Sequence, residues 1–268
     1  MQRRQKIINN INKFLKFLDL RVSNQSNADE VLKFINRLKV QNLGYELVRI
    51  GPEGDGGYLL PNILDEIDYC FSPGVGQINK FEEHLSSFGI KSFLADGTKN
   101  RPETKFQDFE FLKKNLSSIC DESHITLDKW INDNNMSNNE NLILQMDIEG
   151  SEYEVINSTS IDTFKKFKVL VIEFHYFEQI LNEFSFINIQ NALNKILYNF
   201  KVCHIHPNNC CGVHYLGNFD IPSVLEITFL RKDLVKKIKG IDNLPHKLDR
   251  KHKSKFKDII LSKIWYQP

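Results

Sequence analysis

The chain has 268 residues, 41% of them hydrophobic, and a formal net charge of +1. This length and composition favour a soluble globular protein with one large domain or a core domain with appendages. No run of 18 apolar residues occurs and the start lacks the pattern of a secretory signal, so we expect a cytoplasmic protein with no stable membrane insertion.

The charges are distributed unevenly along the chain. Residues 1–21 hold six lysines and arginines and one acid, residues 231–268 hold twelve and four, and the stretch between them is acidic. Basic ends on an acidic body suit an anionic membrane surface, a nucleic acid or a phosphorylated substrate, although such runs are more often solvated faces. Few aromatic residues interleave with the basic C-terminal tail, so we expect no nucleic-acid partner.

The five cysteines are odd in number and lack the paired spacing of a zinc site. Cys210 and Cys211 are adjacent in sequence, which makes them a poor disulfide pair. We therefore expect a reducing compartment.

The N-terminal residues predict two helices. Residues 5–20 place Ile7, Ile11 and Phe14 at helical spacing with lysines and asparagines opposite, which indicates an amphipathic helix. That helix could lie on a membrane, but packing on the core or on a second subunit is the favoured use, so a homodimer is an option. A second helix is expected at about 28–38, with Asn27 among its candidate caps.

Four glycines within seven residues separate two short apolar runs between Leu47 and Pro61, which predicts a tight hairpin. The hairpin explains these glycines by itself. Arg49, Asp55 and Tyr58 are polar groups at its mouth and are candidates for contact with a substrate.

Residues 67–85 indicate a strand, a turn containing Gly74 and Gly76, and a helix, an arrangement that lets the backbone approach a ligand closely. A second strand ends in Asp96 twenty residues after Gly76, where a ribose-binding carboxylate is expected. Asn79 stands where a dinucleotide fingerprint would have its third glycine, which favours a nucleoside without a pyrophosphate, such as S-adenosylmethionine. No P-loop motif occurs, so a P-loop ATPase is unexpected.

The central stretch, residues 141–156, is a short apolar run that ends in Asp147, Glu149 and a glycine before a helical segment. This is typical of a buried parallel strand, whose carboxyl end is where ligands bind in open α/β sheets. Asp147 is therefore the first candidate for chemistry. The alternative is that Asp147 caps the following helix and Glu149 is solvated.

Three more strands are expected in the second half of the chain. The first ends in Glu173 and His175, which share a face, and the second carries His204 and His206. The third, residues 224–230, should pair antiparallel with its predecessor. An edge strand near 109–112, helices near 125–131 and 178–198, and a last short helix near 256–265 complete the pattern.

Alternating strands and helices predict a parallel sheet covered on both faces, with the polar strand ends along one edge. His175 or His206 could act as a general base. A divalent metal is the alternative, held by a set drawn from Asp147, Glu173, His175 and His206, which would lower the pKa of a substrate hydroxyl.

Six motifs together resemble the FkbM-type methyltransferases, a branch of the class I S-adenosylmethionine-dependent enzymes. They are Arg49-Ile-Gly-Pro with Asp55-Gly-Gly-Tyr58, Ser72-Pro-Gly-Val-Gly76, Asp147-Ile-Glu-Gly-Ser-Glu152, Ile172-Glu-Phe-His175, His204-Ile-His-Pro-Asn-Asn209 and Pro222-Ser-Val-Leu-Glu-Ile-Thr-Phe229. The resemblance implies a Rossmann-like, seven-stranded class I methyltransferase sheet with an antiparallel last strand pair. It also implies cofactor contacts from Gly74 and Gly76, a ribose contact from Asp96, and Asp147 close to the reactive methyl group.

We therefore expect a methyltransferase domain at 46–231, an N-terminal helical extension at 1–45 and a basic C-terminal extension at 232–268 packed on the core. The expected activity is O-methylation of a sugar or nucleotide-sugar hydroxyl in surface-polysaccharide biosynthesis. A metal-dependent hydrolase, or a non-catalytic binding protein acting through the basic ends, is the alternative. The cofactor-binding candidates are Ser72, Gly74, Gly76, Asp96, Gly97 and Asp147, and the substrate candidates are Arg49, Asp55, Tyr58, Glu149, His204 and Asn208.

Overall fold

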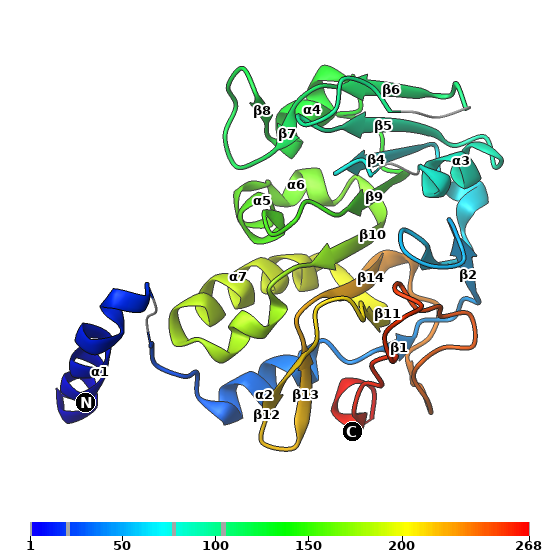
Figure 1. Cartoon of the computed structure of the whole chain (residues 1–268). Coiled ribbons are helices and arrows are strands. Elements are labelled where there is room, and N and C mark those ends of the chain that lie inside the picture. The colour runs from blue at the N-terminus through cyan, green and yellow to red at the C-terminus, as the bar shows by residue number, and fades with distance from the viewer. Residues whose placement is uncertain (1, 20–21, 77–78, 103–105, 268) are drawn as a thin grey trace.

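The computed structural model describes residues 2–19, 22–76, 79–102 and 106–267, and it is built around one seven-stranded sheet (Figure 1). The strand order is β6-β5-β4-β9-β10-β14-β11, and β14 runs antiparallel to both of its neighbours. In that order the strands span Phe109–Leu112, Lys91–Ala95, Tyr69–Pro73, Leu142–Met146, Phe167–Phe174, Leu225–Arg231 and Phe200–Pro207. The predicted α/β class, with a Rossmann-like, mostly parallel seven-stranded sheet and an antiparallel last pair, is confirmed.

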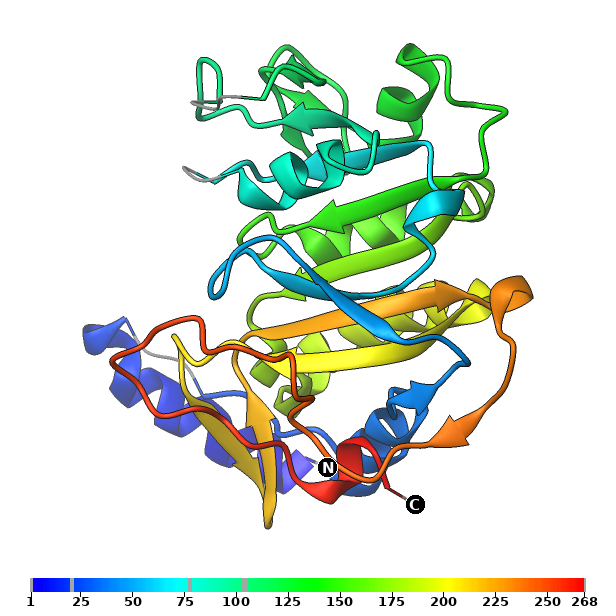
Figure 2. The same cartoon turned by 90° about the vertical axis from the view of Figure 1, so that its right-hand side faces the viewer.

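Helices α5, α6 and α7 lie together behind the sheet in the view of Figure 2. The N-terminus of α2 is capped by Asn27, as predicted, because its side-chain oxygen accepts the backbone N–H groups of Asp29 and Glu30. The α-helices are α1 (Gln2–Leu15), α2 (Ala28–Arg37), α3 (Lys80–Ser86), α4 (Leu127–Asp133), α5 (Glu152–Ser158), α6 (Ile161–Phe164) and α7 (Glu183–Asn199).

Short 3-10 helices and small strand pairs connect these elements. The 3-10 helices are η1 (Lys16–Leu18), η2 (Leu64–Glu66), η3 (Phe177–Leu181), η4 (Lys232–Leu234) and η5 (Lys263–Trp265). The paired strands outside the main sheet are β1 (Gln41–Asn42) with β15 (Lys239–Gly240), β2 (Leu47–Ile50) with β3 (Tyr58–Pro61), β7 (Asn115–Leu116) with β8 (His124–Ile125), and β12 (Val213–Leu216) with β13 (Phe219–Pro222).

Side chains along each central strand alternate between two apolar layers. On β9, Leu144 and Met146 belong to the layer that includes α5, α6 and α7, whereas Ile143 belongs to the opposite layer, which includes α3. Asp147 directly follows β9, so the alternation puts it on the side of Ile143. The acid at this strand end therefore faces away from α5, α6 and α7.

This second face of the sheet is covered by the β2–β3 hairpin and the C-terminal segment, which cross in front of the strands in Figure 2. The predicted hairpin is confirmed, with Ile50 opposite Tyr58 and Leu47 opposite Pro61. The Thr228 hydroxyl on β14 donates a 2.8 Å hydrogen bond to the Leu59 carbonyl and fastens the hairpin to the sheet. Residues at the hairpin mouth are thus held over the ends of the central strands.

The C-terminal segment adds side chains to the core although it contains little regular structure. Trp265 is fully buried, packs against Phe177 and donates its indole N–H to the Asp220 carbonyl. The expected helix near 256–265 is wrong, because only η5 is helical there. Phe256 and Ile260 are exposed, so the apolar residues of this stretch do not form one buried helical face.

Helix α1 lies apart from the sheet and the other helices in Figure 1. No side chain of residues 6–19 is buried, so the expectation that this helix packs on the core is wrong for these residues. Across the described ranges, none of the helices is both long and apolar enough to cross a bilayer.

Replacing Trp265 with Ala should lower the free energy of unfolding by about 3–5 kcal/mol, because it leaves a large cavity against Phe177. Urea unfolding of the full chain measures this difference. Phe256→Ala is the matched control in the same segment, and its change should stay within about 0.5 kcal/mol because Phe256 is exposed. Equal effects of the two substitutions would show that the segment does not pack as described.

Candidate active site

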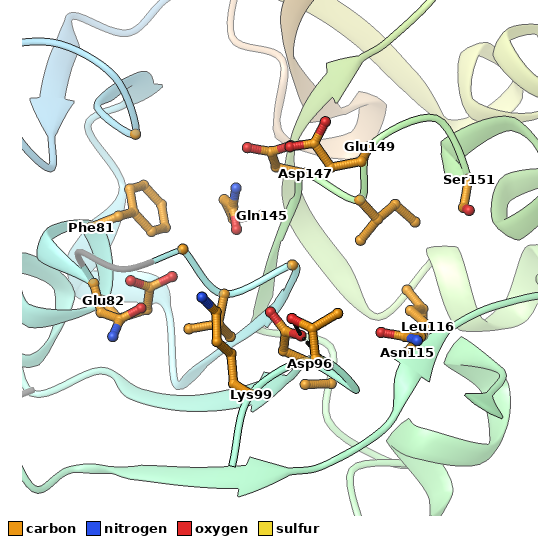
Figure 3. Close-up of a pocket in the computed structure, with 18 of the residues that line it drawn as sticks. Phe81, Glu82, Asp96, Lys99, Asn115, Leu116, Gln145, Asp147, Glu149 and Ser151 are labelled. Atoms are coloured by element: carbon orange, nitrogen blue, oxygen red, sulfur yellow. Dashed lines mark hydrogen bonds between the residues drawn. The ribbon is translucent and has the colours of Figure 1, made fainter. Parts of the chain in front are cut away.

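A cavity of about 810 Å³ opens where the central strands end (Figure 3). Gly74 and Gly76 after β4, Asp96 after β5, and Asp147 after β9 all line it. The hairpin contributes Asp55, Gly56 and Tyr58 to the wall, and β7 contributes Asn115 and Leu116. The residues singled out at the ends of β4, β5 and β9 therefore meet around one space, whereas those singled out on β10 and β11 do not line it.

Gly74 permits the close approach between β4 and β9 that shapes this cavity. Its φ angle is +84°, and a Cβ atom at this position would lie 1.6 Å from the Asp147 carbonyl oxygen. Any side chain would thus both strain the backbone and displace the loop that carries Asp147.

Asp96 presents one free carboxylate oxygen. Its Oδ1 accepts hydrogen bonds from the Thr98 backbone N–H (2.7 Å) and the Thr98 hydroxyl (2.6 Å), while Oδ2 has no hydrogen-bond partner among the residues that the structure describes. Gly97 does not line the cavity, but its N–H donates to the Asn115 side chain, which does. An acid at the end of the second strand is well placed to accept hydrogen bonds from ribose hydroxyls.

A buried chain of hydrogen bonds runs along the wall of the cavity from Glu82 to the hairpin. The Ser72 hydroxyl lies 2.5 Å from Glu82 Oε1 and 2.7 Å from Gln145 Oε1. Gln145 Nε2 donates to Tyr58 Oη, which fixes the orientation of the amide. The Ser72 hydroxyl is the donor to both oxygens. Burial raises the pKa of Glu82, although the Ser72 hydrogen bond opposes this shift. Ser72, a predicted cofactor contact, is thereby engaged in this chain of hydrogen bonds.

The loop after β9 is organised by Glu152, whose side chain is completely buried. Its Oε1 accepts hydrogen bonds from the backbone N–H groups of Ile148 and Gly150 and lies 3.1 Å from His175 Nδ1. Glu149 adopts a φ angle of +56° within this loop. Ser151, not Asp147, occupies the N-cap position of α5, so the capping alternative for Asp147 is wrong.

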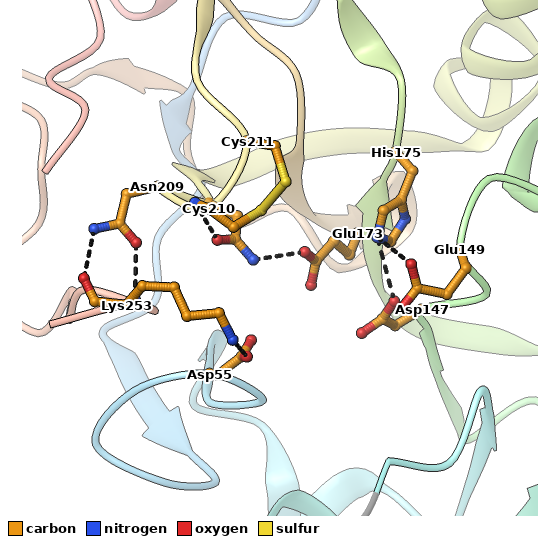
Figure 4. Close-up of a disulfide and its surroundings, with 10 residues drawn as sticks. Asp55, Asp147, Glu149, Glu173, His175, Asn209, Cys210, Cys211 and Lys253 are labelled. Carbon is orange, nitrogen blue, oxygen red and sulfur yellow. Dashed lines mark hydrogen bonds and ion pairs between the residues drawn. A yellow bond between two sulfur atoms is a disulfide. The ribbon is translucent and has the colours of Figure 1, made fainter. Parts of the chain in front are cut away.

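The other nitrogen of His175 faces two carboxylates. His175 Nε2 lies 3.4 Å from Glu149 Oε2 and 3.8 Å from Asp147 Oδ1 (Figure 4). Burial and the nearby Glu149 raise the pKa of Asp147 to about 7, although His175 opposes this shift. Burial alone would lower the pKa of His175, but the Glu152 hydrogen bond and the surrounding carboxylates outweigh it and raise the value to about 9. At neutral pH His175 is therefore an imidazolium beside a carboxyl group that titrates.

The same three side chains are a candidate cation site. One ligand atom each from Asp147, Glu149 and His175 lies within 4.8 Å of the others. Glu152 holds His175 Nδ1 from behind, as outer-shell carboxylates do for metal-binding histidines. Of the metal set expected from the sequence, the structure gathers Asp147 and His175 here, whereas Glu173 accepts a hydrogen bond from Asn208 and His206 lies further along the sheet.

A transverse row of ionisable side chains crosses the second face of the sheet. Glu226 on β14 is the middle of the row, with Glu173 on β10 to one side and His206 on β11 to the other. Asp147, which follows β9, ends the row beside Glu173. All but Asp147 are buried outside the cavity lining. The row therefore begins at the cavity and continues under the C-terminal segment.

The C-terminal segment supplies the charges that pair with this row. His252 Nε2 lies 2.6 Å from Glu226, and although burial would lower the pKa of His252, Glu226 raises it to about 9. Asp249 lies 3.0 Å from His204 and 3.5 Å from His206. Burial would raise the pKa of Asp249, but the two histidines hold it well below its usual range. The catalytic role expected of His206 stays a prediction.

Two of the predicted substrate residues lie on the hairpin, and only one of them lines the cavity. Asp55 lines the cavity and lies 2.5 Å from Lys253, whereas the Arg49 guanidinium is outside the lining and donates to the carbonyls of Pro52 and Gly54. Arg49 thus stabilises the hairpin turn. Tyr58 and Glu149 line the cavity, and His204 and Asn208 do not.

The loop after β11 contains a disulfide between Cys210 and Cys211, so the expectation that these adjacent cysteines pair poorly is wrong (Figure 4). Asn208 holds this loop from both sides, since its Oδ1 accepts the Cys210 N–H and its Nδ2 donates to Glu173. The loop can turn sharply because Gly212 has a φ angle of +85°. The disulfide therefore belongs to a turn anchored on the buried acidic row.

Sequence reasoning missed several groups that shape this site. Glu152 ends the motif that begins at Asp147, but nothing in the spacing of that motif showed that its side chain would point inward and hold His175. Gln145 had no assigned role, although its polar identity in an otherwise apolar strand was an available signal. Lys99 is the one lysine or arginine in the lining that the described residues form, among six acids.

A family model described as the methyltransferase FkbM domain matches residues 60–200, just over half of the chain. The matched region includes the glycine turn, Asp96, Asp147 and His175. No curated protein matches the chain.

The Glu152→Gln variant should lower the pKa of His175 from about 9 to near or below 6.5, because it removes the buried negative charge and leaves burial to favour the neutral imidazole. NMR titration of the imidazole nitrogens of the full chain, with a chelator present, measures this. A His175 pKa that does not move would mean that Glu152 does not control this imidazole.

Proposed function

This chain belongs to the FkbM methyltransferase family, and we propose that it transfers a methyl group from S-adenosylmethionine to a hydroxyl of a sugar or nucleotide-sugar in surface-polysaccharide biosynthesis. The observation that carries the proposal is one cavity that is lined by a glycine turn, a ribose-type carboxylate and Asp147, with His175 behind Asp147 at 3.8 Å. A nucleoside site would position the methyl donor, and an adjacent acid–base pair would take the proton from a poorly acidic hydroxyl.

The lining residues fit the cofactor. Asp96 offers a free carboxylate oxygen for a ribose, and Gly74 and Gly76 leave the adjoining wall without side chains. Six acids in the lining favour a cationic sulfonium ion. Bound S-adenosylmethionine supplies an electrophilic methyl group.

Asp147 is the proposed base. It lines the cavity, and its pKa of about 7 matches proton transfer near neutral pH. Asp147 would take up the hydroxyl proton as the acceptor oxygen gains the methyl group, with the C–S bond broken and S-adenosylhomocysteine released. His175, held by Glu152, stabilises the Asp147 carboxylate before this transfer and fixes its orientation.

The acceptor end of the cavity is lined by Asp55, Tyr58 and Glu149, whose oxygens suit the hydroxyl groups of a sugar. This acidic wall repels phosphate, so a nucleotide-sugar would keep its sugar inside and its diphosphate at the rim beside Lys253. Because its two substrates are cytoplasmic metabolites, we place the reaction in the cytoplasm.

A divalent metal is the second mechanistic option. Asp147, Glu149 and His175 would hold it, and the metal would lower the pKa of the acceptor hydroxyl directly. The two options differ in their response to chelation, since a base on Asp147 needs no metal.

Binding of S-adenosylhomocysteine to the full chain tests the cofactor site. Asp96→Ala should weaken the affinity by roughly 10- to 100-fold, because it removes charge-assisted hydrogen bonds to the ribose. Asp55→Ala, in the same cavity but on the hairpin, should leave the affinity nearly unchanged. Calorimetric titration measures both. Absence of binding to the wild-type chain would remove the methyltransferase proposal.

Asp147→Asn should lower kcat/KM by about 10²- to 10⁴-fold while S-adenosylhomocysteine still binds, because the amide cannot take up the proton. The assay is release of S-adenosylhomocysteine with acceptors from a sugar and nucleotide-sugar screen, with and without EDTA. His206→Gln is the comparison variant. A fully active Asp147→Asn protein would contradict the assignment of Asp147 as the base. If only His206→Gln loses activity, the base is His206. If the wild-type protein loses activity in EDTA, the metal mechanism is favoured.

A further inference from the structure

The N-terminal helix exposes an apolar stripe that the rest of the chain leaves uncovered. Its large apolar side chains are 41–70% exposed, and they recur at helical spacing along α1 and η1. They are Ile7, Ile11, Phe14, Phe17 and Leu18.

This stripe has no role in the core. None of the side chains of residues 6–19 is buried, and Figure 1 shows α1 set apart from the sheet. Asn12 makes paired hydrogen bonds with the Val22 backbone, which connect the helix to the chain that follows it and not to the sheet. A 14-residue helix is only marginally stable in water, so its amphipathic face needs a surface to pack against.

The charges of the segment indicate what that surface is. Residues 1–21 hold six lysines and arginines and one acid. Lys6, Lys13 and Lys16 are exposed, and none of the three forms an ion pair with a described residue. Around the helix axis these lysines lie beside and opposite the apolar stripe, an arrangement typical of helices that lie in the plane of a membrane interface.

We propose that α1 and η1 bind peripherally to an anionic membrane surface, with Phe14 and Phe17 in the apolar boundary layer and the lysines among the lipid headgroups. The charge of the segment complements anionic lipid, whereas pairing two copies of the helix would bring like charges together. Binding of this kind needs no membrane-spanning segment. The proposal is independent of the methyl-transfer reaction.

The test is sedimentation of the full chain with lipid vesicles. The wild-type partition coefficient should be at least about tenfold larger for phosphatidylcholine vesicles with about a third phosphatidylglycerol than for pure phosphatidylcholine, and it should fall in high salt. No preference for the anionic vesicles would overturn the proposal.

Variants assign the binding to the helix. The double substitution Phe14→Glu with Phe17→Glu should reduce the partition coefficient to that of pure phosphatidylcholine. Phe88→Glu is the matched control on an exposed aromatic of the α3 end, and it should bind as the wild type does. Lys255→Glu with Lys257→Glu, in the basic C-terminal segment, should keep most of the binding.

Three results would contradict the proposal at this stage. The Phe14 and Phe17 variant could bind vesicles as the wild type does. The Lys255 and Lys257 variant could be the one that loses binding, which would assign the surface to the C-terminal segment. Light scattering could instead show a wild-type dimer that becomes a monomer in the Phe14 and Phe17 variant without any vesicle binding, which would make a second copy the occupant. Unchanged unfolding by urea in each variant confirms that the fold is intact.

Discussion

The buried carboxylate of Glu152 is the interaction on which the site depends. One of its oxygens accepts hydrogen bonds from two backbone N–H groups in the loop after β9, and the same oxygen lies 3.1 Å from His175 Nδ1. Its Oε2 is buried without a hydrogen-bond partner among the described residues, so the contacts of Oε1 with the loop and the imidazole are what offset the cost of burying this group. Asp147 and Glu149 reach the cavity because this loop cannot relax elsewhere.

The sheet also determines how the remaining charges are accommodated. Its register brings an acid from β10, an acid from β14 and a histidine from β11 into line under the hairpin side. Such a row would be costly in an apolar interior. The C-terminal segment brings His252 and Asp249 to it, which leaves Asp147 as the member of the row that reaches the cavity. This segment thus covers the buried part of the row and leaves its Asp147 end at the cavity.

Local patterns in the sequence predicted much of this arrangement. Asp96 and Asp147 each follow an apolar run, and the end of a buried strand is a position that periodicity alone can locate. The pairing of Glu226 with His252 could not be found in this way, because the C-terminal segment has no period and its contacts are set by tertiary packing. The same holds for Cys210 and Cys211, whose pairing depends on how Asn208 and Gly212 shape one turn. Residues 256–265 contain apolar residues at a spacing that suits a helix, but the structure buries Trp265 and leaves Phe256 exposed.

Ser72 and Gln145 connect Glu82 to Tyr58 through buried hydrogen bonds. The Ser72 hydroxyl donates to Glu82 and to the Gln145 carbonyl oxygen, and Gln145 Nε2 donates to Tyr58 Oη, so the phenol keeps its own hydrogen. Burial and the nearby carboxylates raise the pKa of Tyr58 well above its usual value, so that hydrogen stays in place at neutral pH. The hairpin wall therefore presents a phenolic donor to the cavity, where an oxygen lone pair, and not a second donor, complements the phenol.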